Sequence, residues 1–596
     1  MEPCSPPHRG DCLGRGLLLL QVLLATIPGI LVASWIVNEA HHGMDFQDES
    51  FALLVAEHPD EYQLLPTRIG YFLRPFLLAC GHDIPLLRVF SYLLLATGLF
   101  LNFVQGRRIS TGTDPGATER LNLFSLALLL ASFSWIARSG TCRTLGYNQQ
   151  TAVLLLFLSA CVLAWMASPD KPSRRWSWSH FFTGFILTWL AMVKPSAVLL
   201  LAPVAGLVLL CLGYFKRLYP SLCVLAGAAV LLLPYFLLVE SPAALTANLK
   251  EWRSQEAVLQ SGHGLAQATA FAYRETLAIY GETLRFFSTR FMASLVLLAC
   301  ACTFFRKRIP LPVAAVCALV LLPMAATSGN LHAFAATFVH SFSGGFALAV
   351  SILCAALLTA TAYRGRSFWA QPLVPWCGFL CLAAPLLYSF GSEVEFQSRA
   401  GGAVTLCLGM AILLADAGAS RQGASRSWIP AACALLLAFY LHPRWQNPSA
   451  PSGTPPAWDL EGLPHLDEVD PAEFSTVLDN ARKAGWTAQT EVLDLWGRYP
   501  GITYLLGGRS PVWPWYMSTY SGATKFTAYN LTKLPPERLA RLWLLEAEPA
   551  QPHIPLEKMP LPGGFPAGYE QVGLFRFREN SALPWTHVRL WRPKPD

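Results

Sequence analysis

Long apolar runs separated by short polar loops fill the chain as far as Leu441, and we count about thirteen of them. A helix needs roughly 20 apolar residues to cross a bilayer, so the shorter runs must take in flanking residues. The pattern predicts an all-α polytopic membrane bundle within residues 1–441. The runs are Leu17–Val37, Pro85–Val104, Leu121–Ile136, Thr151–Met166, Phe181–Val193, Ala197–Leu212, Leu222–Val239, Phe291–Phe305, Pro312–Ala326, Phe342–Ala362, Val374–Phe390, Ala403–Leu414 and Ile429–Leu441.

The pattern changes after Leu441. Residues 442–462 are rich in Pro, Ser and Gly and indicate a linker. Residues 463–596 show shorter periodic segments and predict a small soluble α/β domain. Asp470-Pro471 supplies an N-cap and a first-turn proline. The predicted helices are 471–484 and 535–545, and the predicted strands are 491–495, 502–506, 569–575 and 587–591.

Two interhelical loops are long enough to hold structure of their own. Within loop 39–84 we expect short helices at 49–57 and 68–79, lying on the membrane surface. Within loop 241–290, apolar residues at helical spacing around Tyr280 predict an interfacial helix.

Composition and charge support a membrane protein and give its orientation. The chain is 53% hydrophobic and 14% charged, whereas soluble domains carry about 25% charged residues. The net charge of +7 comes from basic residues in alternate loops, which is the positive-inside pattern and not a nucleic-acid-binding surface. We therefore expect an inner (plasma) membrane protein with a cytoplasmic N-terminus, and loops 39–84 and 241–290 and the C-terminal domain on the outer, periplasmic face. The basic groups are Arg107/Arg108, Lys171/Arg174/Arg175, Lys216/Arg217, Arg306/Lys307/Arg308, Arg364/Arg366 and Arg421/Arg426.

An acidic cluster, Asp45, Asp48 and Glu49, follows the first apolar run. Carboxylates are costly next to hydrocarbon, so a cluster at this place indicates a function. Such groups can act as a general base or as ligands of a divalent cation. A solvated loop is the alternative.

Several other polar residues stand at the outer ends of spans. Arg88 lies about one turn inside the second run, where an unpaired charge would cost up to ~3 kcal/mol. An ion pair with a loop carboxylate would relieve that cost, and snorkelling is the alternative. Tyr147 and Asn148 open the fourth run. Lys194, between the fifth and sixth runs, departs from the charge rule and is suited to hold a phosphate, and a solvated loop lysine is the alternative.

A later outer loop carries Glu393, Glu395 and Arg399. Arg399 could contact an acceptor or a carrier phosphate, and a solvated turn is the alternative.

The order of these motifs resembles the GT-C superfamily of integral-membrane glycosyltransferases. The motifs are Asp48-Glu49, then Arg-Val-Phe-Ser from Arg88, then Tyr147-Asn148, then Met-Val-Lys-Pro around Lys194. The closest branch looks like the protein O-mannosyltransferases and the bacterial lipid A aminoarabinose transferases. The resemblance covers roughly residues 15–440 and is strongest in 40–200.

That resemblance implies an inverting transfer of a sugar from a polyprenyl-phosphate carrier, by analogy undecaprenyl phosphate, to a lipid, glycan or protein acceptor of the cell envelope. It implies Asp48 as the base with Glu49 beside it, and Lys194 and Arg88 as phosphate contacts. Many members carry an aspartate where this chain has Asn148, which leaves the use of a divalent cation open. A polymerase or ligase of lipid-linked oligosaccharides, or a transporter or flippase, are the competing functions.

Overall fold

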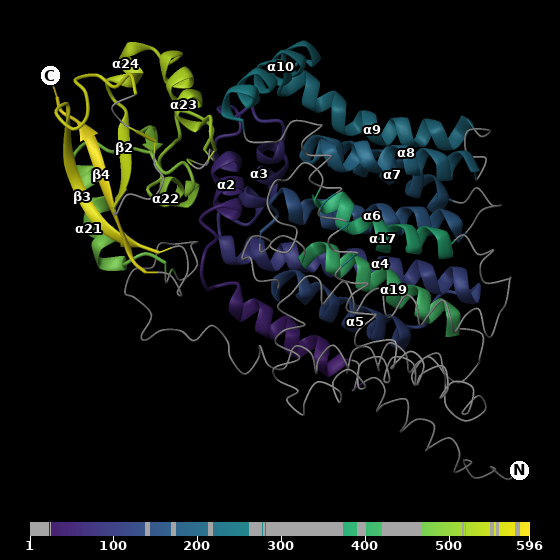
Figure 1. Ribbon diagram of the computed structural model, residues 1–596. Coiled ribbons are helices and arrows are strands. Elements are labelled where there is room, and N and C mark those ends of the chain that lie inside the picture. Colours follow the sequence, from purple (N-terminus) through teal and green to yellow (C-terminus); the bar gives the residue numbers. More distant parts are fainter. Residues whose placement is uncertain are drawn as a thin grey trace, which may run out of the picture.

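The computed structural model (Figure 1) describes residues 26–136, 144–167, 174–211, 218–260, 373–389, 401–419, 468–514, 520–548, 559–578 and 584–595, together with a few single residues. Its helices form a bundle, and a smaller domain with a sheet lies beyond one end of that bundle. We call this the domain-facing end, and the opposite one the remote end.

The bundle helices lie side by side, and each coincides with an expected apolar run (Figure 1). A first helix covers residues 26–39. The predicted runs at 291–305, 312–326, 342–362 and 429–441 lie outside the described residues. The labelled helices of the bundle are α4 (Ile84–Thr111), α5 (Ala117–Ile136), α6 (Tyr147–Met166), α7 (Arg174–Val193), α8 (Pro195–Cys211), α9 (Leu218–Leu238), α17 (Leu373–Ser389) and α19 (Gly401–Ala419).

Within the described ranges, three helices are long and apolar enough to cross a membrane: α4, α6 and α9. On α9, Leu237 and Leu238 are 80% and 83% exposed, as expected of side chains that face lipid. The chain thus has the character of a helical membrane protein with a C-terminal α/β domain. The sequence predicts about thirteen spans, and the described residues contain three helices that meet the length and hydropathy of a span.

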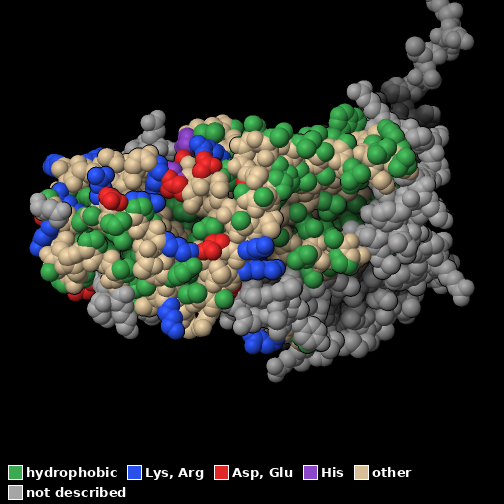
Figure 2. All heavy atoms as spheres, turned by 90° about the horizontal axis from the view of Figure 1, so that it is seen from above, with side chains coloured by type: hydrophobic (Ala, Val, Ile, Leu, Met, Phe, Trp, Pro, Cys, Tyr) green, Lys and Arg blue, Asp and Glu red, His purple; other side chains and the backbone are tan. Residues whose placement is uncertain are grey.

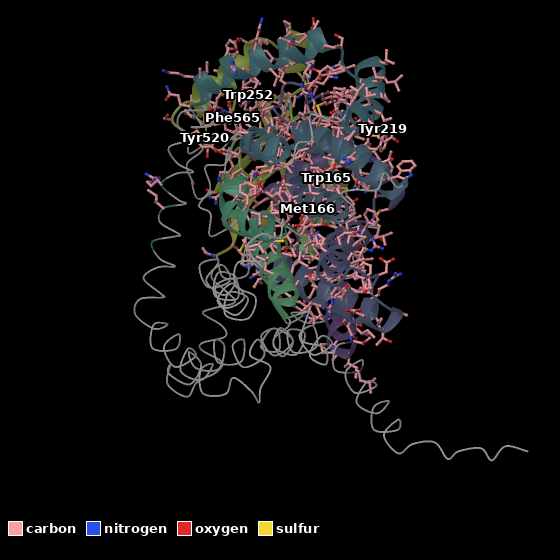
Figure 3. The ribbon with its side chains drawn as sticks, turned by 90° about the vertical axis from the view of Figure 1, so that its right-hand side faces the viewer. Trp165, Met166, Tyr219, Trp252, Tyr520 and Phe565 are labelled. Carbon is pink, nitrogen blue, oxygen red and sulfur yellow. The ribbon has the colours of Figure 1, made fainter. Side chains whose placement is uncertain are left out.

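Aromatic residues mark the remote end of the bundle. Figure 3 looks onto that end, with Trp165 at the end of α6 and Tyr219 at the start of α9. Trp and Tyr are enriched where membrane meets water, so both positions fit a helix end at an interface.

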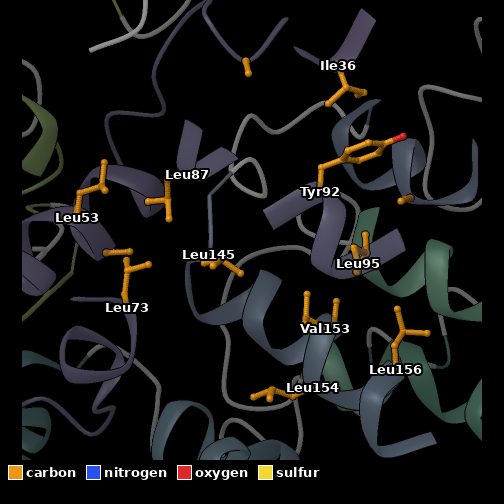
Figure 4. Packing of buried hydrophobic residues seen from close by; sticks show 14 of the residues in the cluster. Ile36, Leu53, Leu73, Leu87, Tyr92, Leu95, Leu145, Val153, Leu154 and Leu156 are labelled. Carbon is orange, nitrogen blue, oxygen red and sulfur yellow. The ribbon is translucent and has the colours of Figure 1, made fainter. Parts of the chain in front are cut away.

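The bundle is packed from apolar side chains of neighbouring helices, among them Leu87 and Leu95 of α4 and Leu154 of α6 (Figure 4). Glycine allows the closest approach, between α7 and α9. A Cβ on Gly184 would lie 1.9 Å from the carbonyl oxygen of Val224, and one on Gly227 would lie 1.9 Å from that of Phe181. These two helices therefore meet backbone to backbone, as small residues permit in membrane bundles.

Three further helices lie between the bundle and the C-terminal domain: α2 (Asp48–Glu57), α3 (Ile69–Ala79) and α10 (Pro242–Leu259). Helices α2 and α3 confirm the two predicted in loop 39–84. The helix predicted around Tyr280 lies almost wholly outside the described residues.

The C-terminal domain holds a four-stranded sheet in the order β1-β2-β4-β3, with β1 parallel to β2 and the other neighbours antiparallel. The predicted helix after Asp470 and three of the four predicted strands are confirmed. The elements are α21 (Pro471–Lys483), β1 (Val492–Asp494), α22 (Pro500–Leu505), α23 (Ala523–Thr532), α24 (Pro536–Leu539), β2 (Trp543–Glu548), β3 (Tyr569–Phe577) and β4 (Thr586–Pro593).

Two predictions for this domain were wrong. Residues 502–506 belong mainly to helix α22, which starts at Pro500 and packs on α2, and not to a strand. The helix predicted over 535–545 ends at Leu539, because the apolar residues from Trp543 onward pair with β1 and β4 as β2. Helix α23 was not predicted.

The C-terminal domain is fixed to both long loops. Arg509 pairs with Glu61 of loop 39–84, and Lys533 pairs with Glu251 on α10. The Gly522 amide donates to the Leu259 carbonyl (3.2 Å). In Figure 2, charged side chains gather on the domain and at its junction, whereas the visible bundle surface is mostly hydrophobic.

Candidate active site

Arg88 and Glu49 form a buried, bidentate ion pair at the domain-facing end. Arg88 Nε donates to Glu49 Oε1 (2.8 Å) and Nη2 donates to Oε2 (2.7 Å), and both side chains are fully buried. Two parallel charge-assisted bonds are the strongest geometry open to this pair. The ion pair expected from the cost of burying Arg88 is present, and Glu49 is the carboxylate that provides it.

The same guanidinium shapes the turn that leads into the acidic cluster. Arg88 donates to the carbonyls of Ala40 (2.8 Å), His42 (3.3 Å) and Gly43 (2.7 Å). Gly43 has a φ of 62°, which a residue with a Cβ rarely adopts. Arg88 thus fixes the backbone between the first helix and α2, and its donors are occupied by these groups.

Asp45 and Asp48 lie next to this pair. Asp45 accepts hydrogen bonds from the amides of Gln47 (2.9 Å) and Glu49 (3.4 Å), so it holds the start of α2. Asp48, the first residue of α2, is only 4% exposed. Burial, and next the nearby Asp48 carboxylate, raise the pKa of Asp45 to about 7. Two carboxylates this close can hold a proton near neutral pH.

A second polar group lies where α6 and α8 begin. Lys194 Nζ donates to Asn148 Oδ1 (3.1 Å) and stands 5.7 Å from the centre of the Tyr147 ring. Lys194 is 5% exposed and Asn148 is 3% exposed. The residues predicted from two separate motifs, Tyr147-Asn148 and Met-Val-Lys-Pro, are therefore in contact.

The first turn of α6 is polar throughout. Gln149 and Gln150 are also buried there, and Trp189 Nε1 donates to Gln150 Oε1 (3.0 Å). An ammonium beside the amide end of a helix is a favourable place for an anion.

Loop 39–84 joins the two groups. A Cβ built on Gly146, the N-cap of α6, would lie 3.8 Å from the Ala52 side chain of α2. Thr67 donates to the Val193 carbonyl (2.7 Å), and the Arg68 amide donates to that of Met192 (2.8 Å). The acidic helix and the residues before Lys194 are thus held together at one end of the bundle.

Sequence reasoning missed a second buried ion pair, between Arg68 and Glu240. Arg68 Nε donates to Glu240 Oε2 (2.9 Å) and Nη2 donates to Oε1 (3.2 Å), and Tyr235 and Asn248 donate to the same carboxylate (both 2.6 Å). The pair fastens α3 to the α9–α10 junction. The available signal was a lone glutamate, Glu240, directly after an apolar run.

The remaining predictions for the site concern Arg399 and a divalent cation. Arg399 lies outside the described residues. Over the described ranges, no three His, Cys, Asp or Glu side chains are grouped so as to hold a metal ion. Asp45 and Asp48 could supply two oxygen ligands, so cation binding stays a prediction.

Comparison with known proteins gives no match. No protein-family model matches the chain, and no curated protein or solved structure is significantly similar to it. The likeness to the GT-C superfamily therefore stays a resemblance in the order of motifs.

Proposed function

We propose that the chain is an inverting glycosyltransferase that moves a sugar from a polyprenyl-phosphate carrier to an acceptor at the outer face of the plasma membrane. The observation that carries the proposal is the placing of Asp48 and Lys194 at one end of an apolar bundle, both nine-tenths or more buried. A carboxylate to take a proton and an ammonium to hold a phosphate are the two charges that this reaction needs.

The reaction uses these groups in one displacement. The acceptor hydroxyl oxygen attacks C1 of the sugar while its proton passes to the Asp48 carboxylate. The bond between C1 and the phosphate oxygen breaks, and the polyprenyl phosphate leaves with the bonding electrons. Lys194 stabilises the negative charge that develops on the leaving phosphate.

Glu49 and Arg88 have a supporting part in this scheme. Arg88 and Glu49 bind each other, and Arg88 also binds the carbonyls of the turn. These bonds orient α2 and with it Asp48. The resemblance to the GT-C superfamily implies other roles for these two residues: Glu49 stands beside the base Asp48, and Arg88 contacts the phosphate.

The thirteen-span GT-C architecture, the outward orientation and a cell-envelope acceptor belong to the same proposal. The supporting observation is that Arg107 and Arg108 lie near the last turn of α4, at the opposite end of that helix from Arg88, which pairs with Glu49 beside Asp48. The positive-inside rule makes that remote end cytoplasmic.

The test compares Asp48→Asn with Asp60→Asn. Asp60 is an exposed carboxylate of the same loop, bonded to the Tyr71 hydroxyl (2.7 Å). Lipids extracted from cells with Asp48→Asn should lose one sugar decoration and accumulate the polyprenyl-phosphate sugar, with turnover about 10²- to 10⁴-fold lower. Asp60→Asn should match the wild type. Unchanged glycolipids at equal protein levels in the Asp48→Asn cells would refute the proposal.

A further inference from the structure

The C-terminal domain contacts the acidic segment through Phe46, one of the two residues between Asp45 and Asp48. Phe46 follows Asp45 and is 2% exposed. Its ring meets that of Phe577 edge to face, with the centroids 4.9 Å apart. Tyr499 packs on the same Phe577 ring at 4.9 Å. We call Phe46, Tyr499 and Phe577 the aromatic clamp.

Backbone contacts strengthen this attachment. The Gly501 amide, in the first turn of α22, donates to the Phe46 carbonyl (3.1 Å). Ser50 of α2 donates through its hydroxyl to the Asp45 carbonyl (2.5 Å). Phe46 is therefore bonded directly to the C-terminal domain, and Ser50, on the other side of Asp48, is bonded to the residue before Phe46.

Gly501 shows how close this contact is. A Cβ at that position would lie 2.6 Å from Phe46 Cδ1, 2.8 Å from Phe46 Cα and 2.7 Å from Ser50 Oγ. Any side chain there must push α2 and the acidic segment away from α22. The atoms that approach Gly501 this closely belong to Phe46 and Ser50, which lie on either side of Asp48.

A buried carboxylate inside the domain, Asp494, fixes the position of Tyr499 in the aromatic clamp. Asp494, at the end of β1, accepts hydrogen bonds from the amides of Trp496 (2.9 Å), Arg498 (3.1 Å) and Tyr499 (3.1 Å). These bonds fix the turn between β1 and α22, and so the place of Tyr499. A continuous chain of contacts therefore links the sheet to the acidic segment, from Asp494 to Tyr499, then to Phe577 and then to Phe46.

We propose that the C-terminal domain is a positioning part of the active site, which acts through the aromatic clamp and Gly501 to hold Asp48 where it can take the acceptor proton. This rests on the proposed function above. Because the clamp touches the acidic segment and not Lys194, it governs turnover and not the binding of the donor phosphate.

The test uses the purified full-length protein with Gly501→Ala, and with Phe577→Leu as a milder change that keeps an apolar side chain. The matched control is Gly116→Ala, since a Cβ there meets nothing within 4 Å. Thermal unfolding first establishes that each variant is folded. Hydrogen exchange of the Asp45–Ser50 amides and steady-state kinetics with a synthetic polyprenyl-phosphate sugar are then measured on the same samples.

We expect exchange of the Asp45–Ser50 amides to rise at least tenfold in both clamp variants and to be unchanged in Gly116→Ala. We expect kcat to fall at least tenfold while KM for the donor stays within twofold. Unchanged exchange, or raised exchange with wild-type kcat, would overturn the inference. A wild-type protein that transfers no sugar would instead overturn the proposed function, while the exchange result would still decide whether the clamp holds the segment.

Discussion

Arg88 and Glu49 join two parts of the chain that the sequence separates, the second apolar run and the acidic loop, through two hydrogen bonds inside a site closed to solvent. Breaking a buried pair leaves a charge without compensation and costs about 3–5 kcal/mol. Arg88→Met or Glu49→Leu should therefore lower the thermal unfolding temperature strongly. The double variant should lose less than the sum of the two, because it removes both charges.

The exposed pair of His82 and Glu57 (2.7 Å) is the control for this cycle. His82→Ala should change the free energy of unfolding by less than about 1 kcal/mol. Single variants of Arg88 and Glu49 that unfold like the wild type would show that the pair does not hold the loop.

Asp45 gives the fold a pH dependence of its own. Its pKa in the folded chain, about 7, is above the ordinary value of 3.8 because of burial and Asp48. The folded chain therefore binds this proton more tightly than the unfolded chain does, and stability falls as pH rises from about 4 to about 7. Asp45→Asn removes this loss. At pH 8 the variant should unfold at a temperature at least about 2 °C higher than the wild type.

The same comparison at pH 4 should show little difference, since Asp45 is then protonated in the folded wild type. Asp60→Asn serves as the control at both pH values. An Asp45→Asn variant less stable than the wild type at pH 8 would contradict this assignment of the proton.

Lys194 should act on donor binding. Replacing it with Met keeps an unbranched side chain, one atom shorter, and removes the charge. A hydrogen bond to a charged group contributes about 1.5–3 kcal/mol, so the affinity for a polyprenyl phosphate should fall about tenfold to a hundredfold. Isothermal titration with a short-chain polyprenyl phosphate measures this. The control is Lys533→Met, on the C-terminal domain, which should bind the polyprenyl phosphate as the wild type does. Equal affinity of the two variants would show that Lys194 does not bind the phosphate.

The contact of α7 with α9 has little tolerance for a side chain. Gly227→Ala places a methyl group against the Phe181 carbonyl, where 1.9 Å is available, so the helices must separate. We expect a loss of folded protein in size-exclusion chromatography. Gly378→Ala in α17, where a Cβ meets nothing within 4 Å, should be neutral or slightly stabilising. Normal yields of Gly227→Ala would contradict the packing of this helix pair.

Local signals were enough to predict several elements. Asp470 and Pro471 define the start of α21 because a cap and a first-turn proline act within one turn. The run 502–506 was misassigned because four or five apolar residues fit either a strand or a helix. Its packing against Phe46 and Ser50, which lie far away in the sequence, decides the outcome.

For the candidate site, the cost of burial predicted that Arg88 has a carboxylate partner, but not which one. Three acidic residues stand within five positions, and only the geometry of the turn after Ala40 selects Glu49. The contact of Lys194 with Asn148 and the pair of Arg68 with Glu240 join distant segments for which no local pattern exists.

The fastening of loop 39–84 to the C-terminal domain has a consequence for biosynthesis. Tyr62 donates to Ser510, a partner 448 residues further along the chain. At roughly 5–20 residues per second, the ribosome needs about 20 to 90 seconds to supply that partner. Throughout this interval the nascent loop lacks this contact, so a newly made molecule acquires its full geometry only after the C-terminal domain has been synthesised and folded.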